Sequence, residues 1–534
     1  MNKNNWFVVI LAFLLGVTVA LAVFKKMNSR VAGIAASENG KLAEVLSYID
    51  KYYLDTVNRD LLLEGAIQGM LSSLDPHSTY ATATANKEFM EDINGAFEGV
   101  GIQFNIMNDT VMVIATVSGG PSEKVGIRAG DRIVSVDDEN IAGIGITSEQ
   151  VFKSLRGKKG TTVKVGIMRQ GFKEVYSYQV TRDVIPTYTV DVAYMLNDQT
   201  GYIKVNQFGE NTYNEFITAL GKLKKEGMQS LVLDLRGNPG GYLLTAINIC
   251  DVFLPKGEMI VYTEGAKVPS DKMYATERGG FETGKLVVLV DDFSASASEI
   301  VAGAVQDNDR GWVVGRRSFG KGLVQQQFIL SDNSSLKLTV ARYHTPSGRC
   351  IQREYVNGID DYYGDLLRRY DNGEMDFADS IKFDENLKYK TKKGRVVYGG
   401  GGIMPDFFVP LDRDSNVMAF NQMFNSGLMV EFAFNYANEH KTDFLKRFPH
   451  AADYVSGMVV ADQLSNQFIQ FYQQKTKQTY SLNDMGKREL KIWLKALIGR
   501  DLYQEEGFYP VINATDKTIL KALEVIKTNG KTLK

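Results

Sequence analysis

Hydrophobic and polar residues follow three patterns along the chain, and each pattern predicts a different kind of structure. Apolar side chains recur at helical spacing over residues 42–70, which predicts two helices. From Gly99 to Val180, short runs rich in valine and isoleucine predict a β-rich domain with one short helix at Ser148–Leu155. Beyond Pro410 the helical spacing returns. The chain is therefore expected to contain several domains.

Between the β-rich region and the C-terminal helices, strands and helices alternate. The run Leu231–Asp234 is apolar up to its last residue, as expected for a strand that is buried on both faces, and Leu286–Val290 repeats this type. Alternation of this kind predicts an α/β core. The expected strands are Tyr202–Val205, Leu231–Asp234, Leu286–Val290 and Trp312–Val314, and a helix is expected at Thr212–Lys225.

Two stretches show neither the helical spacing of apolar residues nor the apolar runs of a strand. Asp183–Tyr188, which contains Pro186, is interpreted as a linker, and Glu354–Tyr398 as a polar, irregular segment. The basic residues of the second stretch are interpreted as part of a solvated loop; they are Lys388, Lys390, Lys392, Lys393 and Arg395.

Composition narrows the class of protein. The 534 residues are too many for one core, so three or more domains are expected. A net charge of −2 gives no basic bias toward nucleic acid. Cys250 and Cys350 have no metal-ligand spacing; they can pair only if folding brings them together, and we interpret them as free buried thiols. Without a His-Glu-x-x-His sequence, metal catalysis finds no support.

Residues 6–24 form an almost unbroken apolar run, and basic residues follow it. Its length approaches the roughly 20 residues that span a bilayer. Ala20-Leu21-Ala22 also fits the small-residue cleavage site of a signal peptide. We favour an uncleaved signal anchor, because the run is long for a signal peptide. Either interpretation predicts that the bulk of the chain lies outside the cytoplasm.

The most informative chemical motif is Ser294-Ala295-Ser296-Ala297-Ser298-Glu299-Ile300, which follows an expected strand and opens an expected helix. Ser296 is suited to be a nucleophile, because a helix N-terminus favours negative charge and the Ala297 N–H can bind an oxyanion. Ser296 and Glu299 also fit a capping box, which needs no catalysis. Ser294 and Ser298 compete with Ser296 for any catalytic role.

A catalytic serine needs a base. None of the four histidines lies in a sequence typical of a serine hydrolase, and His77 and His344 are interpreted as structural turn residues. Lysine can replace histidine when burial lowers its pKa. Lys321 stands between two glycines in an apolar setting, although most lysines are solvated surface groups.

A third motif, Asp234-Leu235-Arg236-Gly237-Asn238-Pro239-Gly240-Gly241, directly follows an expected strand. Its paired glycines predict a tight turn with exposed backbone N–H groups, which can hold an oxyanion or a substrate backbone. It lacks the Gly-Lys-Ser/Thr of a phosphate loop. The alternative is a plain structural turn braced by Asp234 and Arg236.

Together these segments resemble the C-terminal processing peptidases, also called tail-specific proteases. The resemblance spans roughly Leu42 to Pro410, and Gly402-Ile403-Met404-Pro405-Asp406 is its weakest match. The segments that carry it are, in order, Leu74-Asp75-Pro76-His77-Ser78, Asp234–Gly241, Ser294–Ile300, Phe319–Gln325 and Tyr343–Arg349.

The resemblance implies roles for individual residues. Ser296 corresponds to the nucleophile of the family and Lys321, 321 − 296 = 25 positions later, to its base. Gln325 corresponds to the residue that orients the base, and the amides of Gly240 and Ala297 to the oxyanion hole. The implied mechanism forms an acyl-enzyme and needs no metal or organic cofactor.

The β-rich region resembles a PDZ domain. Glu98-Gly99-Val100-Gly101-Ile102-Gln103-Phe104 is similar to the loop that binds a terminal carboxylate, and two later segments, Pro121–Ile127 and Ala129–Ile133, also match PDZ patterns. The resemblance implies that the end of a peptide binds at Gly99, Val100, Gly101 and Ile102. The next strand edge would then add the peptide by β-augmentation. The expected partners are proteins with apolar, unstructured C-termini.

The predicted fold is mixed α/β, with a crotonase-like spiral of ββα units as the protease core and an inserted PDZ domain. The C-terminal extension either docks or oligomerises, or packs against the core, and the sequence does not rank the two. Homo-oligomerisation is left open, and no nucleic acid is expected as a partner.

The expected location is the bacterial periplasm or cell envelope, with residues 6–24 in the inner membrane. The expected domains are a signal anchor or signal peptide (1–30), a helical N-terminal domain (37–95), the PDZ domain (96–182), the protease core (188–410) and the helical extension (411–534).

Two other functions fit parts of the pattern. A non-catalytic adaptor would hold peptide tails through the PDZ domain, with Ser296 only capping a helix. An acyl-CoA enzyme would use the crotonase-like core, bind CoA and tolerate the loss of Lys321. The pairing of Ser296 with Lys321 favours a serine endopeptidase over both.

Overall fold

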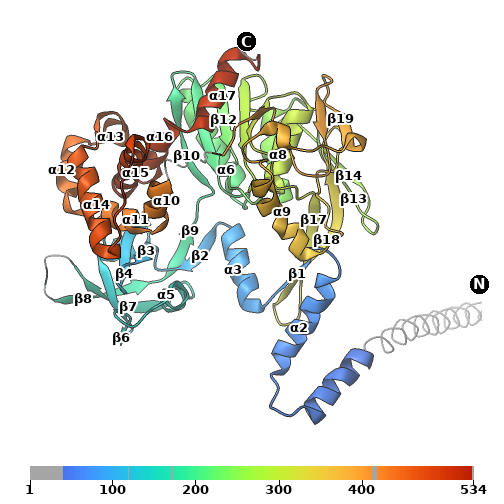
Figure 1. Ribbon diagram of the computed structural model, residues 1–534. Helices are drawn as coiled ribbons and strands as arrows, with labels where there is room; N and C mark the ends of the chain where they lie inside the picture. Colours follow the sequence, from blue (N-terminus) through green and yellow to red (C-terminus); the bar gives the residue numbers. More distant parts are fainter. Residues whose placement is uncertain (1–39, 118, 170–171, 173, 412–417, 532–534) are drawn as a thin grey trace, which may run out of the picture. The chain divides into compact units, whose positions relative to one another are not determined.

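The structure is a computed structural model that describes residues 40–117, 119–169, 172, 174–411 and 418–531. The expected membrane segment, residues 6–24, lies outside the described residues. Among the helices that are described, none is both long enough and apolar enough to cross a bilayer. The chain divides into two compact units, residues 1–73 and residues 74–534 (Figure 1).

The first unit is helical where it is described. Residues 40–52 form one helix and α2 (Arg59–Ser72) forms another, which confirms the prediction from the apolar spacing. α2 begins after Asn58, because the side-chain oxygen of Asn58 accepts hydrogen bonds from Asp60 N and Leu61 N at 3.0 and 3.3 Å.

The β-rich region of the second unit is an antiparallel sheet in the order β3-β4-β5-β7-β8, with β6 (Glu139–Asn140) paired to β5. Its apolar core includes residues of α5 (Ser148–Leu155), the helix that the sequence predicted. The helix α4 (Pro121–Val125) was not predicted, because five residues are too few to show a helical period. The strand bounds are β3 (Ile102–Ile106), β4 (Val111–Thr116), β5 (Arg132–Val136), β7 (Thr162–Met168) and β8 (Val175–Thr181).

The interpretation of Asp183–Tyr188 as a linker was wrong. Its first four residues form β9 (Asp183–Pro186), which pairs antiparallel with β2 (Ala96–Gly99). Pro186 is tolerated because it is the last residue of a strand in a two-stranded sheet, where a missing N–H costs little. The two ends of the β-rich region are thus joined to each other.

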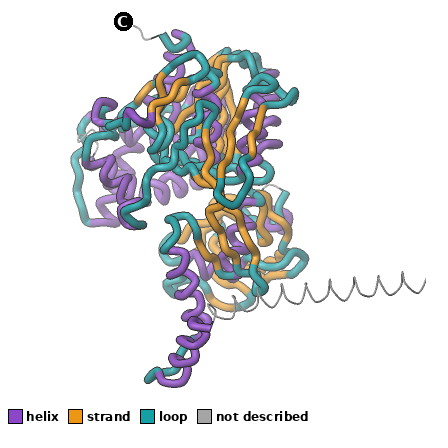
Figure 2. The backbone as a smooth tube through the Cα atoms, turned by 90° about the vertical axis from the view of Figure 1, so that its right-hand side faces the viewer, coloured by secondary structure: helices purple, strands orange, loops and turns teal. Residues whose placement is uncertain are grey.

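The α/β core contains a six-stranded sheet in the order β10-β11-β12-β15-β16-β21, in which β11 to β21 run parallel. Successive side chains of a strand point to opposite faces. Leu231 and Leu233 therefore pack with α6, α7 and α8, whereas Val232 packs with α17. Figure 2 shows the backbone of the strands in orange, with helices in purple on either side of them. Burial on both faces explains the apolar runs. The bounds are β10 (Val190–Asn197), β11 (Thr200–Val205), β12 (Ser230–Asp234), β15 (Lys285–Val290), β16 (Trp312–Gly315), β21 (Phe407–Phe408), α6 (Thr212–Lys225), α7 (Leu243–Phe253), α8 (Ala297–Asp307) and α17 (Lys517–Thr528).

A second sheet of the core is organised around the long strand β18 (Ser335–His344). Its register places Thr339 opposite Gln325 and Lys337 opposite Thr79. His344, which was interpreted as a turn residue, is the last residue of this strand. The other strands are β1 (Thr79–Ala81), β13 (Met259–Glu264), β14 (Asp271–Tyr274) and β17 (Leu323–Ile329), and α3 (Ala83–Ile93) follows β1.

The C-terminal region is helical, as predicted, and has two parts. Helices α10 to α15 surround a hydrophobic core of their own. In contrast, Ile519, Ala522 and Val525 of α17 are fully buried in the cluster on one face of the core sheet. The end of the extension therefore packs against the core. The bounds are α10 (Met418–Asn425), α11 (Leu428–Glu439), α12 (Lys441–Arg447), α13 (Ala451–Gly457), α14 (Asp462–Thr476), α15 (Asp484–Tyr503) and α16 (Glu505–Asn513).

The segment Glu354–Tyr398 is more regular than predicted. It contains the helix α9 (Ile359–Asp371), whose buried residues are Tyr362 and Arg369. Because one of the buried positions of α9 is an arginine, the sequence of the helix appears polar. The helical spacing of its buried residues was missed for this reason. The basic cluster is a hairpin, and its Arg395 pairs with Asp309 and Asp406 instead of facing solvent alone. The remaining bounds are β19 (Lys388–Lys390), β20 (Val396–Tyr398) and the short 3-10 helices η1 (Ala378–Ser380) and η2 (Glu385–Leu387).

Candidate active site

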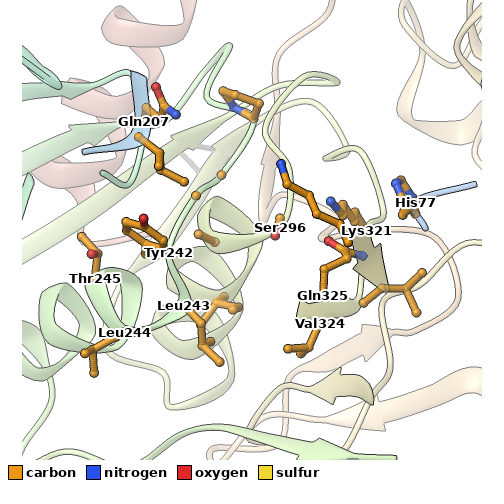
Figure 3. A pocket seen from close by; sticks show the side chains of 18 of the residues that line it. His77, Gln207, Tyr242, Leu243, Leu244, Thr245, Ser296, Lys321, Val324 and Gln325 are labelled. Atoms are coloured by element: carbon orange, nitrogen blue, oxygen red, sulfur yellow. The ribbon is translucent and has the colours of Figure 1, made fainter. Parts of the chain in front are cut away.

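A cavity of about 1010 Å³ opens at the N-terminus of α8. Its lining includes all five residues that the sequence proposed for catalysis: Gly240, Ser296, Ala297, Lys321 and Gln325. Figure 3 shows Ser296 between Tyr242 and Leu243 on one side and Lys321 and Gln325 on the other. The fold therefore brings together residues that lie up to 85 positions apart, since 325 − 240 = 85.

Ser296 has an unusual backbone conformation, with φ 55° and ψ −110°, at the residue that precedes α8. Residues other than glycine rarely adopt such angles, and holding them costs on the order of 1–3 kcal/mol. Strain of this size persists where the surrounding structure imposes it, and it is concentrated at functional sites. Ser296 is half-buried and lies on the cavity wall.

The competing serines of the motif have structural roles. The Ser294 hydroxyl is buried and donates to the carbonyl oxygen of Leu235 at 2.8 Å. The Ser298 hydroxyl is also buried and donates to the carbonyl oxygen of Asn238 at 3.0 Å. Both serines therefore attach the start of α8 to the glycine-rich turn. Of the three, only Ser296 lines the cavity.

Glu299 connects the serine segment to the lysine segment. It is fully buried, and its Oε2 accepts the N–H of Ser296 at 2.8 Å, which is one half of the expected capping box. The same carboxylate accepts the N–H groups of Gly320 and Lys321 at 2.7 and 2.9 Å and the hydroxyl of Ser318 at 2.5 Å. Burial raises the pKa of Glu299, although these four donors oppose the shift.

The glycine-rich turn lies directly against the serine. A Cβ atom on Gly240 would be 2.8 Å from Ser296 Cβ and 2.9 Å from the Ala295 carbonyl oxygen, and φ at Gly240 is +106°. Only glycine fits there. The Gly240 N–H donates to Asn238 Oδ1 at 2.9 Å. The Ala297 N–H, in contrast, has no hydrogen-bond acceptor in the described part of the chain.

Asp234 and Arg236 brace this turn. Burial alone would raise the pKa of the Asp234 carboxyl, but the positive charges of Arg236 and Lys204 hold it well below its ordinary value. Arg236 Nη2 donates to Asp234 Oδ2 at 2.7 Å, and its Nη1 donates to Asp516 Oδ2 at 2.7 Å. Asp516 is the N-cap of α17, so the turn is tied to the C-terminal helix.

Lys321 is half-buried on the cavity wall. Its Nζ makes no ion pair or hydrogen bond with any residue that the structure describes. Burial lowers the pKa of Lys321, and the negative charges of Glu299 and Asp75 oppose part of this shift. An amine in this setting is more readily neutral than a surface lysine, as a general base requires.

His77 lies in a turn, as expected, but it also lines the cavity. Its Nε2 is 2.8 Å from the hydroxyl of Tyr362. Burial, together with the positive charge of Lys321, lowers the pKa of His77 to about 4. His77 is therefore neutral at physiological pH and adds no second cation beside Lys321.

The β-rich region places the proposed peptide-binding loop between two strands. Gly99 ends β2 and Ile102 begins β3. β3 pairs only with β4 in the described part of the chain, so its other edge is available. The rings of Phe104 on β3 and Phe152 on α5 are in contact, with centroids 5.3 Å apart. Aromatic side chains of β3 and α5 therefore lie together in the β-rich region.

Comparisons with known proteins agree with this architecture. Residues 199–361 match peptidase family S41, and residues 99–178 match the PDZ domain. The carboxy-terminal processing protease CtpA of Bacillus subtilis is 34% identical over 393 residues, which are 70% of this chain and 83% of the relative. The chain belongs to the carboxy-terminal processing proteases of peptidase family S41. It is thus a serine-type peptidase with a PDZ domain, as the resemblance implied.

Further comparisons give a second relative, a solved structure and two more family models. A carboxy-terminal-processing protease of Bartonella bacilliformis is 37% identical over 317 residues, which are 58% of this chain and 72% of the relative. The solved photosystem II D1 C-terminal processing protease is 30% identical and covers 57% of this chain and 81% of its own, with a TM-score of 0.33. Residues 20–85 match the N-terminal domain of the activating protease CtpB, and residues 419–504 match a family of unknown function.

Sequence reasoning about this protease missed the residues that hold the site together. Asn238 Nδ2 donates to the carbonyl oxygen of Val205 at 2.9 Å and so fixes the glycine-rich turn to β11. Glu299 was considered only as a capping residue. Both belong to motifs that were recognised, but their partners lie too far away in the sequence for any spacing to indicate them.

Proposed function

We propose that this processing protease cleaves proteins near their C-termini, with Ser296 as nucleophile and Lys321 as general base. The observation that carries the proposal is the placement on one cavity of a strained serine and a lysine whose pKa burial lowers and whose Nζ has no hydrogen-bond or ion-pair partner among the described residues. A hydroxyl is a weak nucleophile until a base takes its proton. A lysine that is neutral near physiological pH meets this need without histidine.

In the proposed reaction, the proton of Ser296 Oγ moves to the lone pair of Lys321 Nζ as Oγ attacks the peptide carbonyl carbon. The C–N bond then breaks, and the protonated Lys321 gives its proton to the departing amine. Water then hydrolyses the resulting ester: Lys321 takes one proton of the water as the water oxygen attacks the acyl carbon, and it returns that proton to Ser296 Oγ as the ester C–O bond breaks. The products are a shortened protein with a new carboxyl terminus and a released C-terminal peptide.

The tetrahedral oxyanion would bind to the free N–H of Ala297 at the start of α8, where the helix dipole also favours negative charge. Gly240 would supply the second N–H. This amide is held by Asn238 Oδ1 in the structure, so the oxyanion has to share or displace that contact. The Gly240 contribution thus depends on a small adjustment of the turn when substrate binds.

The PDZ domain is proposed to capture the substrate's tail. The free edge of β3 can pair with an extended peptide, and the loop Gly99–Ile102 can bind its terminal carboxylate. Phe104 and Phe152 favour apolar side chains in the tail.

The proposal places the enzyme outside the cytoplasm, held at the membrane by residues 6–24, on the basis of their apolar run.

The test uses the purified protein with a peptide that ends in an apolar, unstructured tail, and mass spectrometry to locate new C-termini. Wild type should cleave near the end of the tail, whereas Ser296→Ala and Lys321→Ala should leave the peptide intact while keeping the wild-type Tm. Full cleavage by either variant would reject the dyad. Binding of the tail by wild type with no cleavage would instead support the adaptor function.

A further inference from the structure

The segment Leu74-Asp75-Pro76-His77-Ser78 lies beside the active-site cavity, yet the proposed mechanism gives it no role. We propose that Asp75 and Thr339 are positioning residues that fix which end of the Gln325 amide faces Lys321. They thereby keep the lone pair of the lysine free to accept the proton of Ser296. The inference rests on the proposed function, because it takes Lys321 to be the base.

Asp75 is a buried carboxylate that accepts four hydrogen bonds from described residues. Its Oδ1 accepts the N–H groups of His77 and Ser78 at 2.8 and 3.0 Å, and its Oδ2 accepts the Ser78 hydroxyl at 2.5 Å. Burial alone would raise the pKa of Asp75, but these bonds and one from Thr339 hold it below its ordinary value. Asp75 is therefore ionised at neutral pH, and an ionised carboxylate can only accept hydrogen bonds.

This property of Asp75 fixes the hydroxyl of Thr339. Thr339 Oγ1 lies 2.9 Å from Asp75 Oδ1, so the hydroxyl proton must point toward the carboxylate. A hydroxyl has one proton and two lone pairs, so toward any other neighbour Thr339 can act only as an acceptor.

The neighbour on the other side is Gln325. Thr339 and Gln325 are directly opposite in the β17–β18 pair, and a bulge between Val324 and Gln325 lets Val324 pair with Ala341. Bulges re-aim side chains and are frequent beside active sites. Gln325 Nε2 donates to Thr339 Oγ1 at 3.4 Å. Because Thr339 can only accept, the NH₂ end of the amide must face it, and the carbonyl end must face away.

The carbonyl oxygen of Gln325 is thereby directed to the side of the cavity where Ser296 and Lys321 lie (Figure 3). A neutral lysine amine has two N–H donors and one lone pair. An approaching carbonyl oxygen accepts one of the N–H groups and leaves the lone pair free. An approaching NH₂ group would instead donate into the lone pair and compete with the Ser296 hydroxyl. The orientation of one amide thus decides whether the base is available.

The test compares kcat, KM and the pH profile of kcat/KM among variants of Thr339, Gln325 and Asp75 and a control variant of Thr218. Thr339→Val keeps the shape of the side chain but removes the acceptor for Gln325, so kcat should fall about tenfold or more while KM is unchanged. This loss is smaller than the roughly 10²–10⁴-fold that general base catalysis supplies. Thr339→Ser retains the hydroxyl and should stay within about threefold of wild type. Thr218→Val, at an exposed hydroxyl on α6 that donates to Asn214 O and to no other described residue, is the matched control and should match wild type.

The decisive result is the coupling with Gln325. In a Gln325→Ala background, Thr339→Val should cause no further loss of kcat, because there is no amide left to orient.

Asp75→Asn should also lower kcat. The NH₂ group of the asparagine can donate to Thr339 Oγ1, and the Thr339 hydroxyl proton is then free to point toward Gln325. The Asp75 charge raises the pKa of Lys321, so Asp75→Asn should also move the rising limb of the profile to lower pH. Thr339→Val retains that charge and should not move it.

Two outcomes would overturn the inference. One is a Thr339→Val loss of equal size with and without Gln325, which a purely structural threonine would give. The other is full activity of Thr339→Val at wild-type Tm. Neither outcome touches the proposed function, which is tested separately by the cleavage assay with wild type, Ser296→Ala and Lys321→Ala.

Discussion

The backbone N–H groups of Ser296 and Lys321 donate to the same oxygen atom, Glu299 Oε2, at 2.8 and 2.9 Å. The strained turn that presents the proposed nucleophile and the segment that presents the proposed base are therefore held by one buried carboxylate. A movement of either segment has to break a charge-assisted hydrogen bond in a dry environment, where such bonds are strong.

The shared acceptor predicts that Glu299→Gln disables the enzyme without touching a reacting atom. The amide NH₂ of glutamine would meet at least one of the four donors that the carboxylate accepts, leaving a buried donor unsatisfied at a cost of about 1–3 kcal/mol. We expect kcat to fall about 10²-fold or more, with a lowered Tm. Steady-state kinetics and calorimetry check this. Wild-type kcat in Glu299→Gln would show that the connection is dispensable.

The backbone strain at Ser296 predicts an order of stability between two inactive variants. Glycine adopts positive φ freely, whereas alanine keeps the strain, so Ser296→Gly should be more stable than Ser296→Ala by about 1 kcal/mol. Denaturant unfolding of the two proteins measures the difference. A more stable alanine variant would mean that the conformation at position 296 is not strained.

The contact between Gly240 and Ser296 predicts a sharp contrast between two glycines of the same turn. Gly240→Ala would place a methyl group 2.8 Å from Ser296 Cβ and should abolish cleavage. Gly237 also has positive φ, at +71°, but nothing lies within 4 Å of a Cβ there. Gly237→Ala should cost only about 1–2 kcal/mol of stability and retain most of the activity. Equal losses of activity would contradict the specific role of Gly240.

The packing of α17 on the core sheet predicts that the C-terminal end of the chain is required for the fold. Ile519→Ala removes a side chain that is 1% exposed and should cost about 2–5 kcal/mol. The neighbouring Leu520 is 49% exposed, so Leu520→Ala should stay within about 0.5 kcal/mol of wild type. Urea unfolding of both variants separates the cases. Similar stabilities would argue that α17 is a detachable docking element.

The elements that the sequence predicted well are those with a strong period or a distinctive residue. The consecutive apolar residues Leu231 and Val232 indicated a strand that is buried on both faces. The helices α5 and α6 were predicted correctly because their apolar residues recur at helical spacing. β9 and α9 were missed. β9 contains a proline, which normally argues against a strand. α9 buries an arginine, a residue type that normally indicates an exposed position.

The candidate site was predictable only in part, for a related reason. Ser296 and Lys321 belong to recognisable motifs, and the structure places both on one cavity. The residues that hold Ser296 and Lys321 in place make hydrogen bonds to partners that are distant in the sequence. Thr339 follows Asp75 by 339 − 75 = 264 positions, and the two residues hydrogen-bond because Asp75 shortly precedes β1, which pairs with β18. No local pattern contains that information.

The measurement that tests the central claim most directly is the rate at which a fluorophosphonate labels Ser296 as a function of pH. Because burial lowers the pKa of Lys321, labelling should rise with pH through a midpoint below the ordinary lysine value of about 10.4, and Lys321→Met should abolish the rise. A midpoint at the ordinary lysine value, or the same pH dependence in Lys321→Met, would contradict the account.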